Sequence, residues 1–236
     1  MYQRYFKRIF DIVCALLALV VFCWLYALLA ILIRIKLGSP VIFKQPRPGM
    51  KDKDGKEKIF CLYKFRTMTD ERDENGLLLP DEARMTRFGQ KLRDWSLDEL
   101  PEVINILRGE MSVVGPRPLL VRDMVFMTPE QRKRHDVKPG LSGWAQVNGR
   151  NAISWEDKLK LDLEYIQRAS FLFDLRIVSI TVKKVIKTES ITFESMATAE
   201  DFGDNLLREG KVDADIYADK QLESIGIMER YMEACK

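Results

Sequence analysis

Residues 12–33 read IVCALLALVVFCWLYALLAILI, a stretch of 22 positions without a charged side chain. As an α-helix, which rises about 1.5 Å per residue, the stretch is roughly 33 Å long and can cross the hydrocarbon core of a bilayer. A surface helix of a soluble protein has a polar face, and this stretch has none. It is too long for the apolar part of a cleaved signal peptide, and no small-residue cleavage site follows it. The sequence therefore predicts an N-terminal membrane segment, residues 1–38.

Basic residues flank this stretch on both sides: Arg4, Lys7 and Arg8 before it, and Arg34, Lys36, Lys44 and Arg47 after it. Because positive residues favour the cytoplasmic side, a helix that enters and leaves through the same membrane face satisfies both flanks. Such re-entrant helices usually break at a proline, and residues 21–25 contain none. An ordinary single span is the alternative. Trp24 and Tyr26 favour shallow insertion, because aromatic side chains with polar tips prefer the interface.

The composition excludes several other classes of protein. With 47% hydrophobic residues among 236, the chain is too apolar to be disordered. A single histidine, His135, excludes zinc sites built from several histidines, and no glycine-rich nucleotide-binding loop is present. The four cysteines have no Cys-x-x-Cys spacing, which predicts unpaired thiols in a reducing compartment.

Charge is distributed unevenly along the chain. The net charge is only +3, but ten acidic and five basic side chains lie in residues 200–236, so the preceding body is strongly basic. A basic body beside an apolar anchor suits binding to anionic membrane lipids, anionic substrates or both. The alternative is a solvated surface on which the charged residues are distributed by chance. We expect no nucleic-acid partner. Nothing in the acidic segment 189–236 indicates its role.

Hydrophobic patterns predict a β-hairpin and several helices beyond the membrane segment. Two strands at 40–45 and 58–66 are separated by a turn at Asp54-Gly55. A helix is expected over 98–107, ended by Gly109, and another opens at the Ser154 capping box and runs to about residue 168. The stretch 171–187 predicts an amphipathic helix, which suits either a membrane surface or a protein core.

The sequence SLDELP (96–101) places two adjacent carboxylates, Asp98 and Glu99, at a helix start. Pro101 must lie in the first turn, where its missing N–H costs no hydrogen bond, so both acids lie where the helix dipole favours negative charge. An ionised aspartate can attack phosphorus, and paired carboxylates can hold Mg²⁺. The alternative is that these acids only cap the helix.

Cationic side chains near this pair strengthen the catalytic interpretation. Lys64 lies on the second strand, Arg93 lies five positions before Asp98, and Arg117 lies in the turn GPRP (115–118), where two prolines stiffen the backbone. A guanidinium fixed in this way suits a bidentate phosphate contact. The alternatives are an exposed arginine in a structural turn and a lysine that protects an edge strand. Asp174 fits an arginine partner or a helix cap, and His135 is expected to be structural or exposed.

Five motifs together resemble one family: YKFRTM (63–68), SLDELP (96–101), GEMS (109–112), VGPRP (114–118) and PGLSGWAQVNGR (139–150). In order and spacing they are similar to the bacterial monotopic phosphoglycosyl transferases, over about residues 1–188. The chain looks most like the small, single-domain members that begin glycoconjugate assembly. Those members usually break the membrane helix with a Ser-Pro pair, where this sequence has Cys23-Trp24.

The resemblance implies a fold and a reaction. The fold is α+β and mostly helical, with a re-entrant membrane helix, a short β-hairpin, and amphipathic interfacial helices around a compact catalytic domain, residues 39–188. The reaction is Mg²⁺-dependent transfer of a sugar 1-phosphate from a UDP-sugar to undecaprenyl phosphate, at the cytoplasmic face of the bacterial inner membrane, with release of UMP.

The resemblance also assigns roles to individual residues. Asp98 is the nucleophile that forms an aspartyl-phosphosugar intermediate, and Glu99 handles metal or protons, so the pair would hold Mg²⁺. The expected substrate-binding residues are Lys64, Arg93, Arg117, Arg150 and Asp174. Similarity to the small members favours an N-acetylated amino or deoxy sugar, with UDP-galactose or UDP-glucose as alternatives. A non-catalytic membrane-tethered scaffold is the alternative of another class, and homo-oligomerisation is left open.

Overall fold

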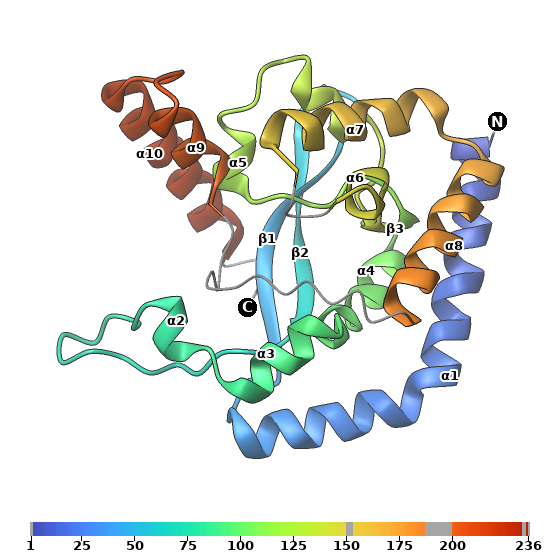
Figure 1. The fold of residues 1–236 in the computed structure, drawn as a ribbon, viewed down its shortest axis with the longest axis horizontal. Coiled ribbons are helices and arrows are strands. Elements are labelled where there is room, and N and C mark those ends of the chain that lie inside the picture. Colours follow the sequence, from blue (N-terminus) through green and yellow to red (C-terminus); the bar gives the residue numbers. More distant parts are fainter. Residues whose placement is uncertain (1, 150–152, 187–199, 233–234, 236) are drawn as a thin grey trace.

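The computed structural model describes all residues except 1, 150–152, 187–199, 233–234 and 236. The described chain is mostly helical and is arranged around a long β-hairpin that runs through its centre (Figure 1). Helix α1 lies along one side of the molecule, and helices α9 and α10 lie on the opposite side of the hairpin. This arrangement confirms the predicted α+β, mainly helical class.

Helix α1 (Lys7–Lys36) follows a short π-helical turn (Tyr2–Phe6) and contains the whole apolar stretch. Among the described residues it is the one helix long and apolar enough to cross a membrane. Most of its large apolar side chains are exposed, which marks it as a candidate membrane segment: Val13, Leu16, Leu17, Val20, Val21, Phe22, Trp24, Leu28, Ile31 and Ile35. Figure 1 shows that α1 changes direction sharply partway along its length, although it contains no proline.

Both halves of α1 pack against the same protein body. Ala15, in the first half, is buried in a cluster with Val103 and Ile106. Leu29 and Ile33, in the second half, are buried in another cluster that includes Phe65. The helix is therefore held to the body on both sides of its bend, and its exposed face points away from that body.

The hairpin consists of β1 (Ile42–Lys51) and β2 (Glu57–Phe65), which pair antiparallel with Ile42 opposite Phe65. Its existence and its turn at Asp54-Gly55 confirm the prediction, but β1 continues well past the expected end at residue 45. Pro46 and Pro48 made the pattern look interrupted. In a two-stranded sheet each strand is an edge strand, and an edge tolerates proline because only alternate N–H groups pair.

The segment after the hairpin carries the candidate dyad. It contains α2 (Asp81–Arg84), α3 (Arg87–Asp94), a 3₁₀ turn (Leu97–Glu99) and α4 (Glu102–Arg108). The expected single helix over 98–107 is wrong at its start, because Pro101 is the N-cap residue of α4 and the dyad lies in the preceding 3₁₀ turn. Gly109 ends α4 with φ +80°, as expected for a left-handed C-cap.

A second small sheet was not apparent in the sequence. Strand β3 (Ser112–Val114) pairs in parallel with β4 (Gly140–Ser142), and α5 (Val121–Met124) and a 3₁₀ helix (Gln131–Asp136) lie between them in the chain. Gly140 allows a close approach here, since a Cβ at this position would lie 2.0 Å from the backbone nitrogen of Gly115. Helix α6 (Trp144–Val147) follows β4 directly.

Helices α7 (Trp155–Arg168) and α8 (Phe171–Ile186) agree closely with the sequence. Ser154 caps α7 and accepts a hydrogen bond from the backbone of Asp157 at 3.1 Å. Helix α8 is amphipathic as predicted, and its contact with a membrane surface stays a prediction. One face is buried and the other exposes a set of apolar side chains: Phe171, Leu172, Leu175, Val182 and Val185.

The acidic C-terminal segment folds onto the body instead of extending from it. Helix α9 (Phe202–Arg208) begins with Phe202, which packs on Trp155 and donates its backbone N–H to Asp123 at 3.0 Å. Helix α10 (Ala214–Met232) places Ile227 and Met228 against the buried residues of α5. The boundaries 1–38, 39–188 and 189–236 stay predictions.

A disulfide joins the C-terminus to the hairpin. Cys61 of β2 is bonded to Cys235, with their Cα atoms 5.7 Å apart, while Cys14 and Cys23 are free. The prediction of four unpaired thiols is therefore wrong for two of them, because spacing along the chain does not reveal a pair separated by 174 residues. The argument for a reducing compartment loses its basis with this correction.

Thiol counting tests the disulfide. We expect two reactive thiols in the denatured, non-reduced protein and four after reduction, because Cys61 and Cys235 are bonded and the other two are free. Cys235→Ser should give three in both conditions. In the matched control Cys14→Ser, the counts should be one and three. Four reactive thiols in the wild-type protein before reduction would contradict the pairing.

Candidate active site

The two carboxylates of the dyad are brought to one place by an unusual backbone turn. Ser96 adopts the left-handed conformation, with φ +53° and ψ +24°. It is the one non-glycine residue with positive φ among those described. Such conformations are uncommon outside glycine and often accompany functional sites. This turn redirects the chain from α3 into the 3₁₀ turn that holds Asp98 and Glu99.

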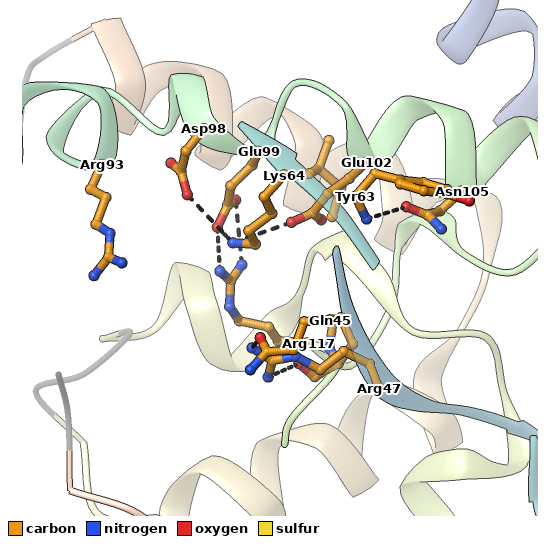
Figure 2. Close-up of polar contacts among 12 residues, drawn as sticks. Gln45, Arg47, Tyr63, Lys64, Arg93, Asp98, Glu99, Glu102, Asn105 and Arg117 are labelled. Carbon is orange, nitrogen blue, oxygen red and sulfur yellow. Dashed lines mark hydrogen bonds and ion pairs between the residues drawn. The ribbon is translucent and has the colours of Figure 1, made fainter. Parts of the chain in front are cut away.

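Glu99 is the centre of the charge cluster. Its Oε1 lies 3.0 Å from Lys64 Nζ and also accepts a hydrogen bond from Arg117 Nη2, and its Oε2 lies 3.4 Å from Arg117 Nη1. Figure 2 shows Lys64 and Arg117 reaching the same carboxylate from different elements. Burial opposes its charge, but Arg117 and Lys64 outweigh burial and hold the pKa of Glu99 far below its ordinary range.

Asp98 experiences a different balance. Its Oδ2 lies 3.6 Å from Lys64 Nζ, whereas Glu99 Oε1 lies 3.0 Å from the same atom. Burial raises the pKa of Asp98, and the negative charge of Glu99 adds to that effect against Lys64 and Arg117. The two adjacent carboxyls thus have pKa values shifted in opposite directions. Such a split indicates different chemical roles, with Asp98 the more basic carboxylate.

Arg93 flanks the dyad from α3. Its Nε donates to Thr67 Oγ1 at 3.0 Å. Helix α3 approaches this segment closely, because a Cβ at Gly89 would lie 1.7 Å from the Thr67 carbonyl oxygen. The positive charge of Arg93 lowers the pKa of Asp98, a smaller effect than those of burial, Lys64 and Glu99. Figure 2 shows Arg93 on the Asp98 side of the cluster, away from Arg117.

The structure brings Lys64, Arg93, Asp98, Glu99 and Arg117 together, and their expected roles stay predictions, but it places Asp174 elsewhere. Asp174 is fully buried on α8 and pairs with Lys7, Tyr2 and Tyr165. Its environment offers no contact to the dyad and no exposed oxygen for substrate. The expected assignment of Asp174 to substrate binding is therefore corrected to a buried contact between α1 and α8. Arg150 lies outside the described residues.

Sequence reasoning missed two charged side chains of the site. Glu102, only 1% exposed, has Oε1 3.3 Å from Lys64 Nζ and a buried Oε2 without a hydrogen-bond partner. Burial, followed by the charge of Glu99, raises the pKa of Glu102 to about 7. The sequence did offer one signal: Glu102 follows Glu99 by three positions, and residues three apart on a helical stretch lie on the same face.

Arg47 is the second missed side chain. It donates to Gln45 Oε1 at 2.6 Å and to the Pro118 carbonyl at 3.1 Å. Burial, together with the neighbouring positive charge of Arg117, lowers the pKa of Arg47 to about 10. In the sequence analysis Arg47 belongs only to the basic flank of the membrane segment. The predicted strand ends at residue 45, before Arg47.

The donor set fits one kind of metal site. Among the described residues, no three His, Cys, Asp or Glu side chains are grouped to hold a metal ion. Mg²⁺ is commonly bound by one or two carboxylates together with substrate phosphates and waters. Asp98 and Glu99 would supply the carboxylates of such a site, and Mg²⁺ binding here stays a prediction.

A buried carboxylate pair framed by lysine and arginine side chains is suited to phosphoryl-group transfer. Cations can neutralise phosphate oxygens, and a carboxylate can act as a nucleophile. A family model described as bacterial sugar transferase matches residues 2–188. The chain belongs to the bacterial sugar transferase family, which confirms the resemblance seen in its motifs and identifies it as an enzyme of the transferase class.

Three relatives illustrate the family. The chain is 50% identical over 196 residues to an uncharacterized sugar transferase, EpsL, of Bacillus subtilis (strain 168), covering 83% of this chain and 95% of EpsL. It is 38% identical over 192 residues to the UDP-glucose:undecaprenyl-phosphate glucose-1-phosphate transferase of Escherichia coli (strain K12), covering 77% of this chain but 40% of that protein.

The third relative acts on a different sugar. It is the UDP-N-acetylgalactosamine-undecaprenyl-phosphate N-acetylgalactosaminephosphotransferase of Aeromonas hydrophila, 35% identical over 190 residues, covering 77% of this chain and 44% of that protein. The chain therefore spans less than half the length of the two relatives whose substrates are named.

The raised pKa of Glu102 predicts how stability changes with pH. Because the folded protein holds this proton more tightly than the unfolded chain, the stabilisation is complete at low pH and is lost as pH rises through about 7. Glu102→Gln has nearly the same shape and no charge. We expect it to be more stable than wild type at pH 8, by roughly 1–3 kcal/mol. The difference should shrink toward pH 5.

Thermal unfolding of the detergent-solubilised protein measures this difference. Glu130→Gln serves as the control, because Glu130 is exposed and lies outside the cluster. An unfolding difference between Glu102→Gln and wild type that stays constant from pH 5 to pH 8 would contradict the prediction.

Proposed function

We propose that this enzyme transfers a sugar 1-phosphate from a UDP-sugar to undecaprenyl phosphate through a covalent intermediate on Asp98. The observation that carries the proposal is the split between the two adjacent carboxyls. Glu99 is fixed as an anion by Arg117 and Lys64, while Asp98 is less tightly paired and more basic. The named substrates of the relatives support this donor and acceptor class.

The first half-reaction uses the donor. One oxygen of Asp98 attacks the phosphorus that carries the sugar, the bond from that phosphorus to the bridging diphosphate oxygen breaks, and UMP leaves with the bonding electrons. Lys64, Arg93 and Arg117 surround the pair and would oppose the negative charge that accumulates on the phosphate oxygens. Mg²⁺, held by Asp98 and Glu99 together with the diphosphate, would neutralise part of the same charge.

The second half-reaction uses the lipid. A phosphate oxygen of undecaprenyl phosphate attacks the same phosphorus, the bond to Asp98 breaks, and the carboxylate is regenerated with undecaprenyl-diphosphate-sugar as the product. A soluble donor and a membrane-bound acceptor therefore meet one carboxylate in sequence. The two substrates need not be bound at the same time.

The contacts of α1 support a re-entrant membrane helix. At its first turns, Arg8 donates to the Leu107 carbonyl at 2.7 Å, and Asp11 accepts from Val113 N at 2.9 Å. In the second half, Tyr26 donates to the Leu100 carbonyl at 2.7 Å. A helix tied to one protein body at both ends has both ends on one side of the bilayer. The basic flanks then favour the cytoplasm as that side.

The exposed apolar face of α8 extends the proposed membrane contact. Phe171 lies beside the start of α1, with ring centroids 5.9 Å from Phe10 and 6.2 Å from Tyr2. Lys183 and Lys184 lie in the last turn of α8. An apolar helix face ending in lysines suits the interface of a membrane that contains anionic lipids.

For the donor we propose an N-acetylated amino or deoxy sugar, and one relative is named for UDP-N-acetylgalactosamine. UDP-glucose, named for another relative, and UDP-galactose are the alternatives. Release of UMP from a panel of UDP-sugars, at equal concentrations and with undecaprenyl phosphate present, separates these donors. The preferred donor is the one with the highest kcat/KM.

Covalent trapping tests the nucleophile. We expect protein incubated with Mg²⁺ and a UDP-sugar radiolabelled in the phosphate next to the sugar, without lipid acceptor, to retain label after denaturation. Asp98→Asn should retain none, because an amide oxygen is a poor nucleophile and cannot form the acyl phosphate. Added undecaprenyl phosphate should then remove the label from wild-type protein.

The control variant is Asp94→Asn, because Asp94 ends α3 nearby and is bonded to Gln90 instead of the cluster. It should be labelled like wild type. Label that is retained by Asp98→Asn, or wild-type protein that releases UMP from the complete mixture without ever becoming labelled, would contradict the aspartyl intermediate.

Cysteine accessibility tests the topology. In an active background with the native cysteines replaced by serine, we expect Gln3→Cys and Lys53→Cys to react with a membrane-impermeant maleimide only when the cytoplasmic side is exposed. Both positions lie on exposed side chains, one before α1 and one in the hairpin turn. Reaction of Cys at position 3 from the periplasmic side, with no such reaction at position 53, would show an ordinary span.

A further inference from the structure

The turn that carries Arg117 is held by hydrogen bonds to three consecutive carbonyl groups. The Pro116 carbonyl accepts from Gly140 N at 2.9 Å, the Arg117 carbonyl accepts from Arg134 Nη2 at 2.6 Å, and the Pro118 carbonyl accepts from Arg47 Nη1 at 3.1 Å. Two of the three donors are arginine side chains that reach the turn from other elements. The direction of the Arg117 side chain therefore depends on groups distant in sequence.

Arg134 is the more deeply buried of these two donors, with 2% of its surface exposed. Its Nε and Nη2 donate to Asp162 Oδ2 of α7 at 3.0 and 2.8 Å, and both side chains of this ion pair are almost fully buried. The Nη2 group that bonds Asp162 also bonds the Arg117 carbonyl. One guanidinium thus connects helix α7 to the turn.

The histidine beside Arg134 completes its surroundings. Arg134 Nη1 lies 3.3 Å from His135 Nε2, and His135 Nδ1 lies 3.4 Å from Glu57 Oε1. A guanidinium can only donate, so Nε2 is the acceptor and the ring proton is on Nδ1, facing Glu57. Every side of the Arg134 guanidinium therefore has a partner, and the group has one well-defined position.

Replacing a buried ion pair by apolar residues is often neutral for stability, so stability alone does not explain such a pair. Here the same guanidinium also bonds the backbone of a residue that contacts Glu99. A group that neutralises phosphate charge acts only when it is held close to the productive geometry.

We propose that the Arg134–Asp162 pair is a positioning device for Arg117: it fixes the turn 115–118 so that the Arg117 guanidinium faces Glu99 and the donor phosphates. This inference rests on the proposed function, because it gives Arg117 a role in transfer. Neither Arg134 nor Asp162 contacts the dyad directly in the structure, so both act through Arg117.

A double-mutant cycle tests the proposal. The rate of UMP release is measured for wild type, Arg134→Lys, Arg117→Ala and the combined variant. Each rate is divided by the number of chains that become labelled by the radiolabelled donor. We expect Arg117→Ala to lower kcat/KM by roughly 100-fold and Arg134→Lys by at least about tenfold. In the Arg117→Ala background, Arg134→Lys should change the rate by less than about threefold, since the group it positions is absent.

A second variant separates positioning from stability. Arg134→Met combined with Asp162→Leu removes both charges and fills the space, so we expect a thermal midpoint close to that of wild type. It also removes the hydrogen bond to the Arg117 carbonyl, and transfer should fall as in Arg134→Lys. Lys133→Met is the matched control, because Lys133 is adjacent in sequence, exposed, and paired only with Glu130 in the described interactions; its rate should equal that of wild type.

Three results would overturn the proposal. Equal fold-losses from Arg134→Lys in the wild-type and Arg117→Ala backgrounds would mean that the two residues act independently. Wild-type transfer by the Met–Leu variant would mean that the hydrogen bond is dispensable. Wild-type activity of Arg117→Ala would remove the role of Arg117 itself; the proposed function would then still be judged separately, by labelling of Asp98.

Discussion

The site depends on the ion pairs that buried Glu99 forms with Arg117 and Lys64. A buried carboxylate without partners would take up a proton, and a buried arginine or lysine without partners would be costly in the same way. Together, the three groups satisfy one another across elements that are far apart in sequence: β2, the 3₁₀ turn and the turn after β3. The cluster therefore stabilises the local fold and keeps two cations beside the carboxylate pair, where the proposed reaction would place phosphate charge. Burial raises the pKa of Asp98, and the cations, which lie closer to Glu99, offset that effect only in part. Asp98 therefore remains the more basic carboxylate of the two.

The candidate membrane helix α1 depends on the same protein body for its shape. A helix without proline has no intrinsic reason to bend sharply, so bends of this kind require packing or inserted groups. In this protein the two halves of α1 are buried against different hydrophobic clusters, one with α4 and one with α3 and the end of β2. Tyr26 contributes apolar contacts to both clusters and donates to the carbonyl of Leu100, next to the dyad segment. The geometry of the candidate membrane segment and the position of the 3₁₀ turn that carries Asp98 and Glu99 are thus stabilised by shared contacts.

Features with local causes could be predicted from the sequence, and features with distant causes could not. The Ser154 cap, the Gly109 end of α4 and the Asp54-Gly55 turn each follow from the conformational preference of a residue and its near neighbours. Lys64 and Arg117 could be identified because one lies on a predicted strand and the other in a proline-stiffened turn near the carboxylate pair. By contrast, the pairing of β3 with β4, the Cys61–Cys235 bond and the bonds of Arg134 join segments through tertiary packing. No periodicity along the chain signals such contacts.

Asp174 shows why motif membership does not by itself define a site. The family resemblance groups it with the polar active-site residues, but its oxygens are bonded to Lys7, Tyr2 and Tyr165, and none of its surface is exposed. The Tyr165 hydroxyl, which donates to Asp174 at 2.8 Å, also lies 3.2 Å from the carbonyl of Val114, the residue that precedes the turn of Arg117. Loss of Asp174 would leave Lys7 as an unpaired buried charge at the start of α1. It would also remove a contact that ends beside the turn of Arg117. A strong effect of this residue on transfer would therefore arise from the junction of α1, α7 and α8, without any contact to substrate.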